Sequence, residues 1–137
     1  MDRRRLAVVW GAVTALAATV NVATVLAHHS FAAEFDADKP VTVKGVITSV
    51  RLENPHSWFF LDVTNPDGKV EKWSFEASTP SSLIRGGFKP GTVKAGDQVT
   101  IRGFHARDAN ANAGAGRELI LADGREIAIG PPVGPGR

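Results

Sequence analysis

The chain has 137 residues, 43% hydrophobic and 22% charged, which suits one small globular domain and leaves no room for two separate cores. Its net charge of +2 comes from Arg3, Arg4 and Arg5 against Asp2, because thirteen basic side chains balance thirteen acidic ones from His28 onward. A neutral domain lacks the strongly basic surface that nucleic acid requires, so no nucleic-acid partner is expected. The absence of cysteine excludes disulfides, thiol catalysis, Cys-ligated zinc and iron–sulfur sites.

The N-terminal segment has the pattern of a secretory signal. A positive stretch, Met1–Arg5, precedes the uncharged run Leu6–Val20, and small residues lead to Ala27. We therefore predict a helical signal peptide of residues 1–27, cleaved after Ala27, and a mature protein that is periplasmic or secreted in bacteria and leaves the membrane. The alternative is an uncleaved anchor, because Leu6–Leu26 is long enough to span a bilayer, although Asn21 and several threonines weaken that span.

After residue 27, short runs rich in Val, Ile, Phe and Trp alternate with Pro, Gly, Asn-Pro and Asp-Gly steps, a pattern typical of strands. In the longest run the apolar residues change from odd positions, such as Val41, to even ones, such as Val50. We expect a bulge beside Gly45 that bends this strand and lets it serve two faces. The predicted strands are Val41–Glu53, Trp58–Val63, Val70–Ala77, Gln98–Arg107, Glu118–Leu121 and Glu126–Ile129.

One short helix and two irregular segments complete the pattern. Thr79 is a suitable N-cap with Pro80 at the first helical position, and Gly86 ends the helix. The Ala/Asn/Gly-rich segment Asp108–Gly116 is predicted to be a flexible loop, and residues 131–137 a disordered tail. Three strands, a helix and further strands predict an all-β domain over residues 28–130, a five- to six-stranded OB-like barrel. A β-sandwich is the alternative.

The four histidines are the candidate metal ligands. His28 and His29 follow the predicted cut, His56 lies in the first loop between strands, and His105 lies near the end of the fourth strand. Because the loops after strands one and four border the binding face of OB barrels, we expect His56 and His105 to come close together.

Cleavage after Ala27 would let the α-amino group and imidazole of His28 chelate one metal ion together. A further imidazole from His56 or His105 would complete a three-nitrogen site of the kind that copper(II) favours, with His29 as a competing ligand. The alternative is a flexible start that binds nothing, with His56 ordering a turn. Zinc held with Asp36 or Glu34 is a weaker possibility, since no HxxxH or HExxH spacing is present.

No catalytic constellation is recognisable. GxSxG, glycine-rich phosphate loops and HxE with paired cysteines are missing from the sequence. We therefore expect a protein that is not an enzyme. Nothing fixes any two of its carboxylates as an acid and base pair, and solvated side chains are the better interpretation. The carboxylates considered are Glu34, Asp36, Asp38, Glu53 and Asp62.

The aromatic residues are expected mainly in the core. Since Trp58–Leu61 is apolar on both faces, at least one aromatic must lie near the outside or beneath a covering segment, for which Phe31 and Phe35 are candidates. Outward aromatics could stack with bases or sugar rings. A patch for an anionic ligand is a weak alternative, formed by Arg51, Lys72, Arg85, Arg102 and Arg107.

Several segments together resemble one family. HHSFAAEFDADKPVTVKG directly after the signal, NPHSWFFLDV, KWSFE, LIRGGF and KAGDQVTIRGFHARD resemble small exported bacterial proteins classified as a domain of unknown function. The resemblance extends over His28–Ile129. It implies a periplasmic or secreted OB-like barrel and brings no reaction, ligand or partner with it.

The prediction for function is an exported, non-enzymatic binding module for a small ligand or an envelope protein. Its binding rim is expected at Asn54, His56, Trp58 and His105, with the loop Asp108–Gly116 beside them. A copper-binding protein with a histidine-brace-like site at His28, His29, His56 and His105 is the alternative.

Overall fold

The computed structural model describes residues 32–131. Contacts within the chain divide it into two units, Met1–Ala33 and Glu34–Arg137. The predicted signal helix, its cut after Ala27 and all but the first residue of the predicted tail lie outside the described residues. Within those residues, no helix is both long enough and apolar enough to cross a membrane.

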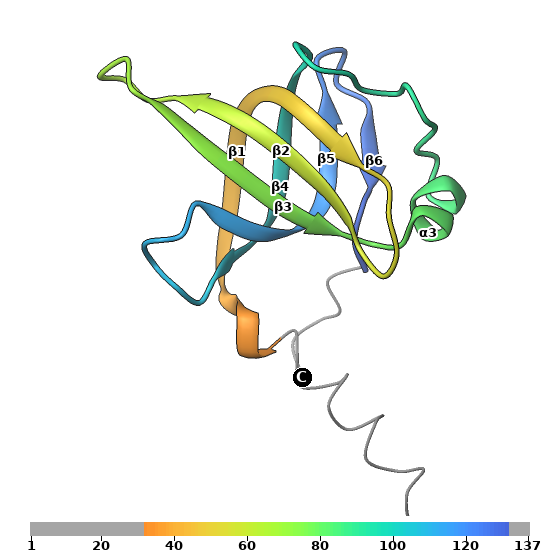
Figure 1. Ribbon diagram of the computed structural model, residues 1–137, viewed down its shortest axis with the longest axis horizontal. Coiled ribbons are helices and arrows are strands. Elements are labelled where there is room, and N and C mark those ends of the chain that lie inside the picture. The colour runs from red at the N-terminus through yellow and green to blue at the C-terminus, as the bar shows by residue number, and fades with distance from the viewer. Residues whose placement is uncertain (1–31, 132–137) are drawn as a thin grey trace, which may run out of the picture. The chain divides into compact units, whose positions relative to one another are not determined.

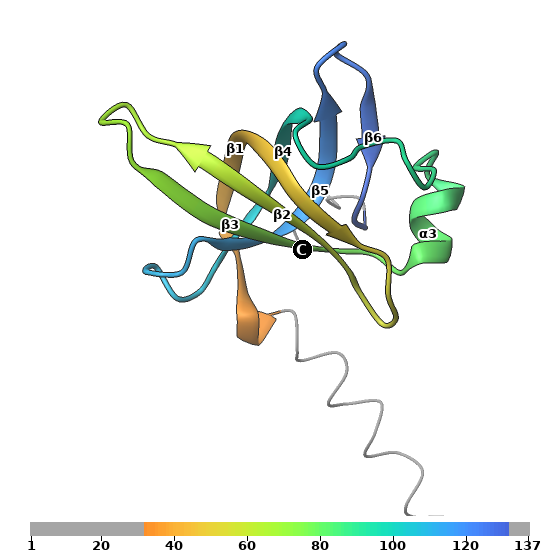
Figure 2. The same cartoon turned by 45° about the horizontal axis from the view of Figure 1, so that its top comes forward.

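In its described residues, the second unit contains six strands and one short helix (Figures 1 and 2). The hydrogen-bonded order is β3-β2-β1-β4-β5-β6, and a parallel pairing of β3 with β5 closes the first five strands into a ring. This closure confirms the predicted all-β class and OB-like strand order, and it excludes a sandwich of two open sheets. The elements are β1 (Phe35–Arg51), β2 (Ser57–Thr64), β3 (Val70–Ala77), α3 (Pro80–Arg85), β4 (Gln98–Ala106), β5 (Ala113–Leu121) and β6 (Glu126–Ala128).

Strand β1 bends and pairs with two neighbours, β4 through its first part and β2 through its last. The predicted switch of apolar phase is present, but the expectation of a bulge beside Gly45 is wrong: the bulge lies between Ile47 and Ser49. Gly45 has a different role. A Cβ there would lie 2.7 Å from the carbonyl oxygen of Asp62, so glycine allows the close approach of β2 at the bend.

The start of β5 corrects the sequence prediction. Ala113–Gly116 was expected within a flexible loop, yet this segment pairs with both β3 and β4 and closes the ring. A Cβ on Gly114 would lie 2.9 Å from the ring of Phe75, and a Cβ on Gly103 would overlap the carbonyl oxygen of Ala115. Small residues with weak strand propensity are therefore required where the strands crowd together at the closure.

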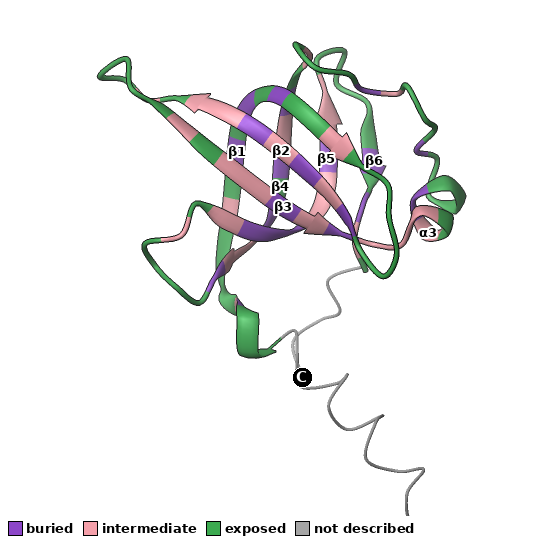
Figure 3. Ribbon diagram, viewed as in Figure 1, coloured by how far each residue is buried: buried purple, intermediate pink, exposed green. Residues whose placement is uncertain are grey.

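Buried residues alternate with more exposed ones along the strands (Figure 3), and the buried side chains fill the interior of the ring. Phe59 and Phe75 are fully buried, and Phe59 meets Phe88 edge-on with ring centroids 5.6 Å apart. The predicted helix α3 is present and adds Leu83 to this core. It begins at Pro80 after Thr79, whose side-chain oxygen accepts a hydrogen bond from the backbone N–H of Ser82. The helix thus helps to fill the ring.

Candidate functional site

Strand β2 carries two aromatic side chains on the outside of the ring. Trp58 and Phe60 are half-buried, whereas the intervening Phe59 faces the core. Their rings lie nearly parallel, with centroids 6.4 Å apart and 22° between planes. The guanidinium carbon of Arg51 lies 5.0 Å from the centroid of Phe60, at cation–π distance. This pair confirms the prediction that at least one aromatic residue of Trp58–Leu61 lies near the outside or beneath a covering segment.

Polar residues border the aromatic pair on both neighbouring strands. In the strand register, Trp58 lies between Arg51 on β1 and Glu76 on β3, and Phe60 lies between Ser49 on β1 and Ser74 on β3. We call this surface the Trp58 face, defined by Trp58, Phe60, Arg51, Glu76, Ser49 and Ser74. It corresponds to the strands that form the binding surface of OB folds.

His56 lies at the edge of the Trp58 face and pairs with Glu76. Its Nδ1 is 2.5 Å from Oε1 of Glu76, and the side chains are 49% and 14% exposed, respectively. Burial raises the pKa of Glu76, and the negative charge of Glu34 adds to this increase, while His56 and Arg117 oppose it. Because Nδ1 of His56 faces the carboxylate, Nε2 is the nitrogen left to bind a ligand or metal.

His105 has different surroundings. Its Nδ1 lies 2.7 Å from the carbonyl oxygen of Ala106, and its ring meets Trp73 edge-on at 5.7 Å between centroids. Trp73 packs against the core, whereas Glu76, three residues along β3, projects from the opposite face. The structure therefore does not bring His56 and His105 together, and the expectation that they meet is corrected.

The remaining predicted ligands do not form a cluster. Residues 32–131 contain no group of three or more His, Asp or Glu side chains that could hold a metal ion. His28 and His29 lie outside the described residues. For the zinc alternative, Asp36 pairs with Lys39 at 3.6 Å, and the carbonyl oxygen of Glu34 accepts a hydrogen bond from the backbone N–H of Arg107.

Two loops flank the Trp58 face. The β1–β2 loop contains Asn54, which is exposed, and the Asn54–Pro55 peptide bond is cis. The β4–β5 loop is tied to β3, because the carbonyl oxygen of Asn112 accepts a hydrogen bond from the backbone N–H of Ser74. Phe35, one of the two predicted covering residues, is buried, and Phe31 lies outside the described part of the chain.

Two of the five basic side chains in the expected anion patch pair with acidic neighbours. Lys72 pairs with Asp62 at 3.2 Å, and Arg102 pairs with Glu118 at 3.2 Å. Such exposed pairs add little stability, but they reduce the positive charge that these two side chains would offer to an anion. These pairings do not support the anionic-ligand alternative.

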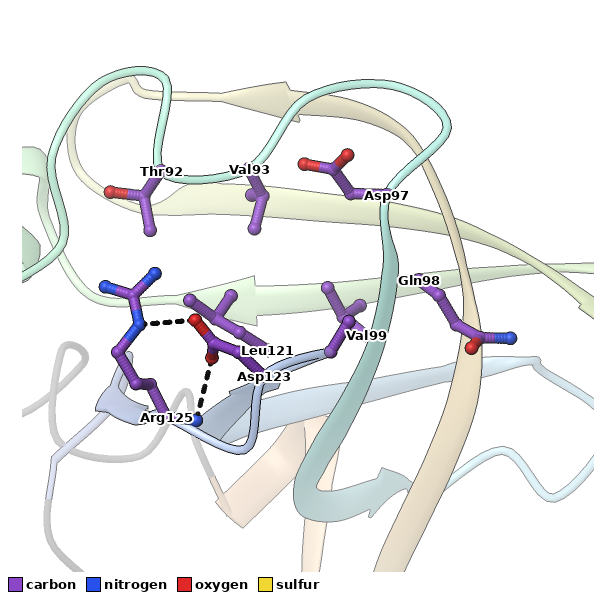
Figure 4. Close-up of a pocket in the computed structure, with 9 residues that line it drawn as sticks. Thr92, Val93, Asp97, Gln98, Val99, Leu121, Asp123 and Arg125 are labelled. Atoms are coloured by element: carbon purple, nitrogen blue, oxygen red, sulfur yellow. Dashed lines mark hydrogen bonds and ion pairs between the residues drawn. The ribbon is translucent and has the colours of Figure 1, made fainter.

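A pocket of about 250 Å³ lies where β4 begins and β5 ends (Figure 4). Sequence reasoning missed it because its residues come from separate turns. Its charged groups already have partners: Asp123 binds Arg125 at 2.8 Å, and Asp97 binds Lys94 at 3.0 Å. The uncharged polar residues of its lining are Thr92 and Gln98. Its labelled lining residues are Thr92, Val93, Asp97, Gln98, Val99, Leu121, Asp123 and Arg125.

These observations define a small all-β protein in which a closed five-stranded ring carries an aromatic and polar outer face. The model of a family of unknown function, DUF6152, matches residues 15–115, and the chain belongs to this family. The resemblance to a family of unknown function, inferred from the sequence, is thereby confirmed. None of the curated proteins compared with the chain matches it.

Proposed function

We propose that this protein is an exported, non-enzymatic binding module that acts in the periplasm or outside the cell. It holds a small ligand or an envelope protein on the Trp58 face. The observation that carries this proposal is the aromatic pair Trp58 and Phe60, which stays partly exposed on the outside of the ring, whereas Phe59 between them is fully buried in the core. Outward aromatic side chains beside polar groups are typical of binding surfaces.

Export is the first part of the proposal to test. The full-length protein is expressed in a bacterial host, and the periplasmic and membrane fractions are analysed by mass spectrometry. We expect a soluble chain that begins at His28, because the cut after Ala27 is the predicted one. A chain that retains Met1 in the membrane fraction would contradict cleavage and support the anchor.

Binding is tested by NMR chemical-shift mapping of the exported protein against size-fractionated periplasmic small molecules and purified envelope proteins. We expect shifts at Trp58, Phe60 and Glu76, and their loss in Trp58→Ala. Val70→Ala is the matched control, since Val70 is 56% exposed on β3 but lies outside the Trp58 face. Shifts confined to the pocket near Arg125 would contradict the proposal.

A copper-binding role is the second candidate, and the His56–Glu76 pair favours it. Histidines that bind metals usually donate their other ring nitrogen to a carboxylate or carbonyl, as His56 does toward Glu76. The α-amino group and imidazole of His28 would supply two more nitrogens after cleavage, with His29 as a competing ligand.

Copper titration of the exported protein tests this candidate. We expect His28→Ala and His56→Ala each to weaken copper binding at least about tenfold, or 1.4 kcal/mol. His105→Ala is the matched control because His105 packs against Trp73. Unchanged affinity in the first two variants, or an N-terminus other than His28, would overturn the copper role without affecting the Trp58 face.

A further inference from the structure

The Trp58 face combines an aromatic strip with polar groups of both signs. The strip is formed by Trp58 and Phe60, whose ring planes differ by 22°. The cation Arg51 lies beside Trp58 on β1, and the carboxylate of Glu76 lies on its other side on β3. A ligand lying along β2 would therefore meet an apolar surface beneath it and hydrogen-bonding groups at both edges.

We propose that this face binds a neutral oligosaccharide. The proposal rests on the proposed binding function and names the ligand class of the same site. A pyranose ring has an apolar C–H face, which packs on a flat aromatic ring, and a rim of hydroxyls that both donate and accept hydrogen bonds. An aromatic surface with a few placed polar groups is the chemistry that orients such a ligand.

Trp58 is the main stacking platform. Arg51 already lies over Phe60, so Phe60 supports the strip and Arg51 is held beside it. The guanidinium donates hydrogen bonds to sugar hydroxyls, and the carboxylate of Glu76 accepts them. His56 holds that carboxylate through Nδ1. Ser49 and Ser74, on either side of Phe60, provide hydroxyls for the next sugar ring.

Charge favours a sugar over a single-stranded nucleic acid. Nucleic-acid grooves pair stacking aromatics with a basic track that follows the phosphates. Here Glu76 borders the strip, and Lys72 further along β3 is paired with Asp62. The carboxylate of Glu76 would repel the phosphates of a nucleic acid, and the face has no excess of cations to offset this repulsion. A neutral sugar experiences no such repulsion.

The test uses the full chain after export, with NMR titrations against maltohexaose and hexa-N-acetylchitohexaose, both neutral hexasaccharides. The probes for other ligand classes are a twelve-residue oligothymidylate and a proline-rich decapeptide. We expect at least one sugar to shift the indole N–H of Trp58 and the amides of Phe60 and Glu76. Trp58→Ala should weaken binding at least about tenfold, while Trp58→Phe retains most of it. Val70→Ala should bind as wild type does.

The outcomes separate the ligand class from the binding function. If neither sugar shifts these residues while the oligothymidylate or the peptide does, the sugar proposal is overturned and the binding function stands. If none of the four probes shifts the Trp58 face, the sugar proposal is overturned, and the extract and envelope-protein titrations decide the binding function. Sugar binding that is unchanged in Trp58→Ala would also overturn the proposal.

Discussion

The two faces of β2 carry similar residues in different surroundings. Phe59 and Leu61 are 0% and 1% exposed inside the ring, whereas their neighbours Trp58 and Phe60 remain half-buried outside it. The difference arises because β3 pairs with β5 and encloses only one face of the strand. An aromatic residue on β2 is therefore a core residue or a surface residue according to its position in the pleat, independently of its hydrophobicity.

The largest expected effect comes from truncating one aromatic on each face. Phe59→Ala should lower the free energy of unfolding by about 3–5 kcal/mol, because it leaves a cavity in the packed interior. Phe60→Ala should cost about 1 kcal/mol, since a half-buried ring gives up less contact. Urea unfolding followed by circular dichroism measures both. Equal losses would contradict the distinction between the two faces.

The tight packing of β4 against β5, which is part of the ring closure, is tested at Gly103. Gly103→Ala should cost about 3 kcal/mol or more, because the new Cβ would overlap the backbone of Ala115. Gly68→Ala is the control: a Cβ there would meet no atom within 4 Å, so only the strain of its positive φ of 83° is expected to cost stability, about 1 kcal/mol. Thermal unfolding compares the two variants, and a Gly103→Ala protein as stable as wild type would refute the tight closure.

The two described histidines extend the comparison to polar residues. His105→Ala should cost about 1–2 kcal/mol, because it removes the edge-on contact with Trp73. His56→Ala should cost about 0.5 kcal/mol, since the His56 side chain is 49% exposed and its contact with Glu76 is partly solvated. Melting temperatures at pH 7 compare the stability losses of the two variants. A larger loss in His56→Ala would show that the outer pair is structural.

The smallest effect depends on pH and concerns Glu76. Burial raises its pKa above 4.5, so the folded state keeps the proton to higher pH than the unfolded chain. The stability from this group is complete below about pH 4.5 and is lost as the pH rises through the raised pKa. Glu76→Gln should therefore equal wild type in stability near pH 4 and slightly exceed it at pH 7. Melting curves at both pH values provide the test; a greater advantage at pH 4 would reverse the sign.

Much of the fold follows from local patterns. The apolar runs predicted the strands Trp58–Val63 and Val70–Ala77, which the structure pairs as β2 and β3, and Thr79 with Pro80 predicted α3. The start of β5 was missed because Ala113–Gly116 has weak strand propensity. These residues form a strand through long-range pairing with β3 and β4, which no local pattern encodes.

For the site, the sequence identified Trp58 and His56 as residues of interest, but Glu76 and Arg51 were missed in their present roles. Glu76 looked like an ordinary outward residue of an alternating strand, and only the register places it beside Trp58. The pairing of His56 with His105 was predicted from loop positions alone. This prediction was wrong, because the position of a residue in or near a loop does not determine on which face of the sheet its side chain lies.

The sequence by itself determined the neutral charge of the chain after residue 27, the all-β class, and the aromatic residue that had to lie outside. Charge and local periodicity suffice for these properties because they depend on nearby residues alone. The tertiary structure decided which side chains share a surface. Ring closure and strand register join residues far apart in the chain, and they place Trp58 with Arg51 and Glu76 while separating His56 from His105.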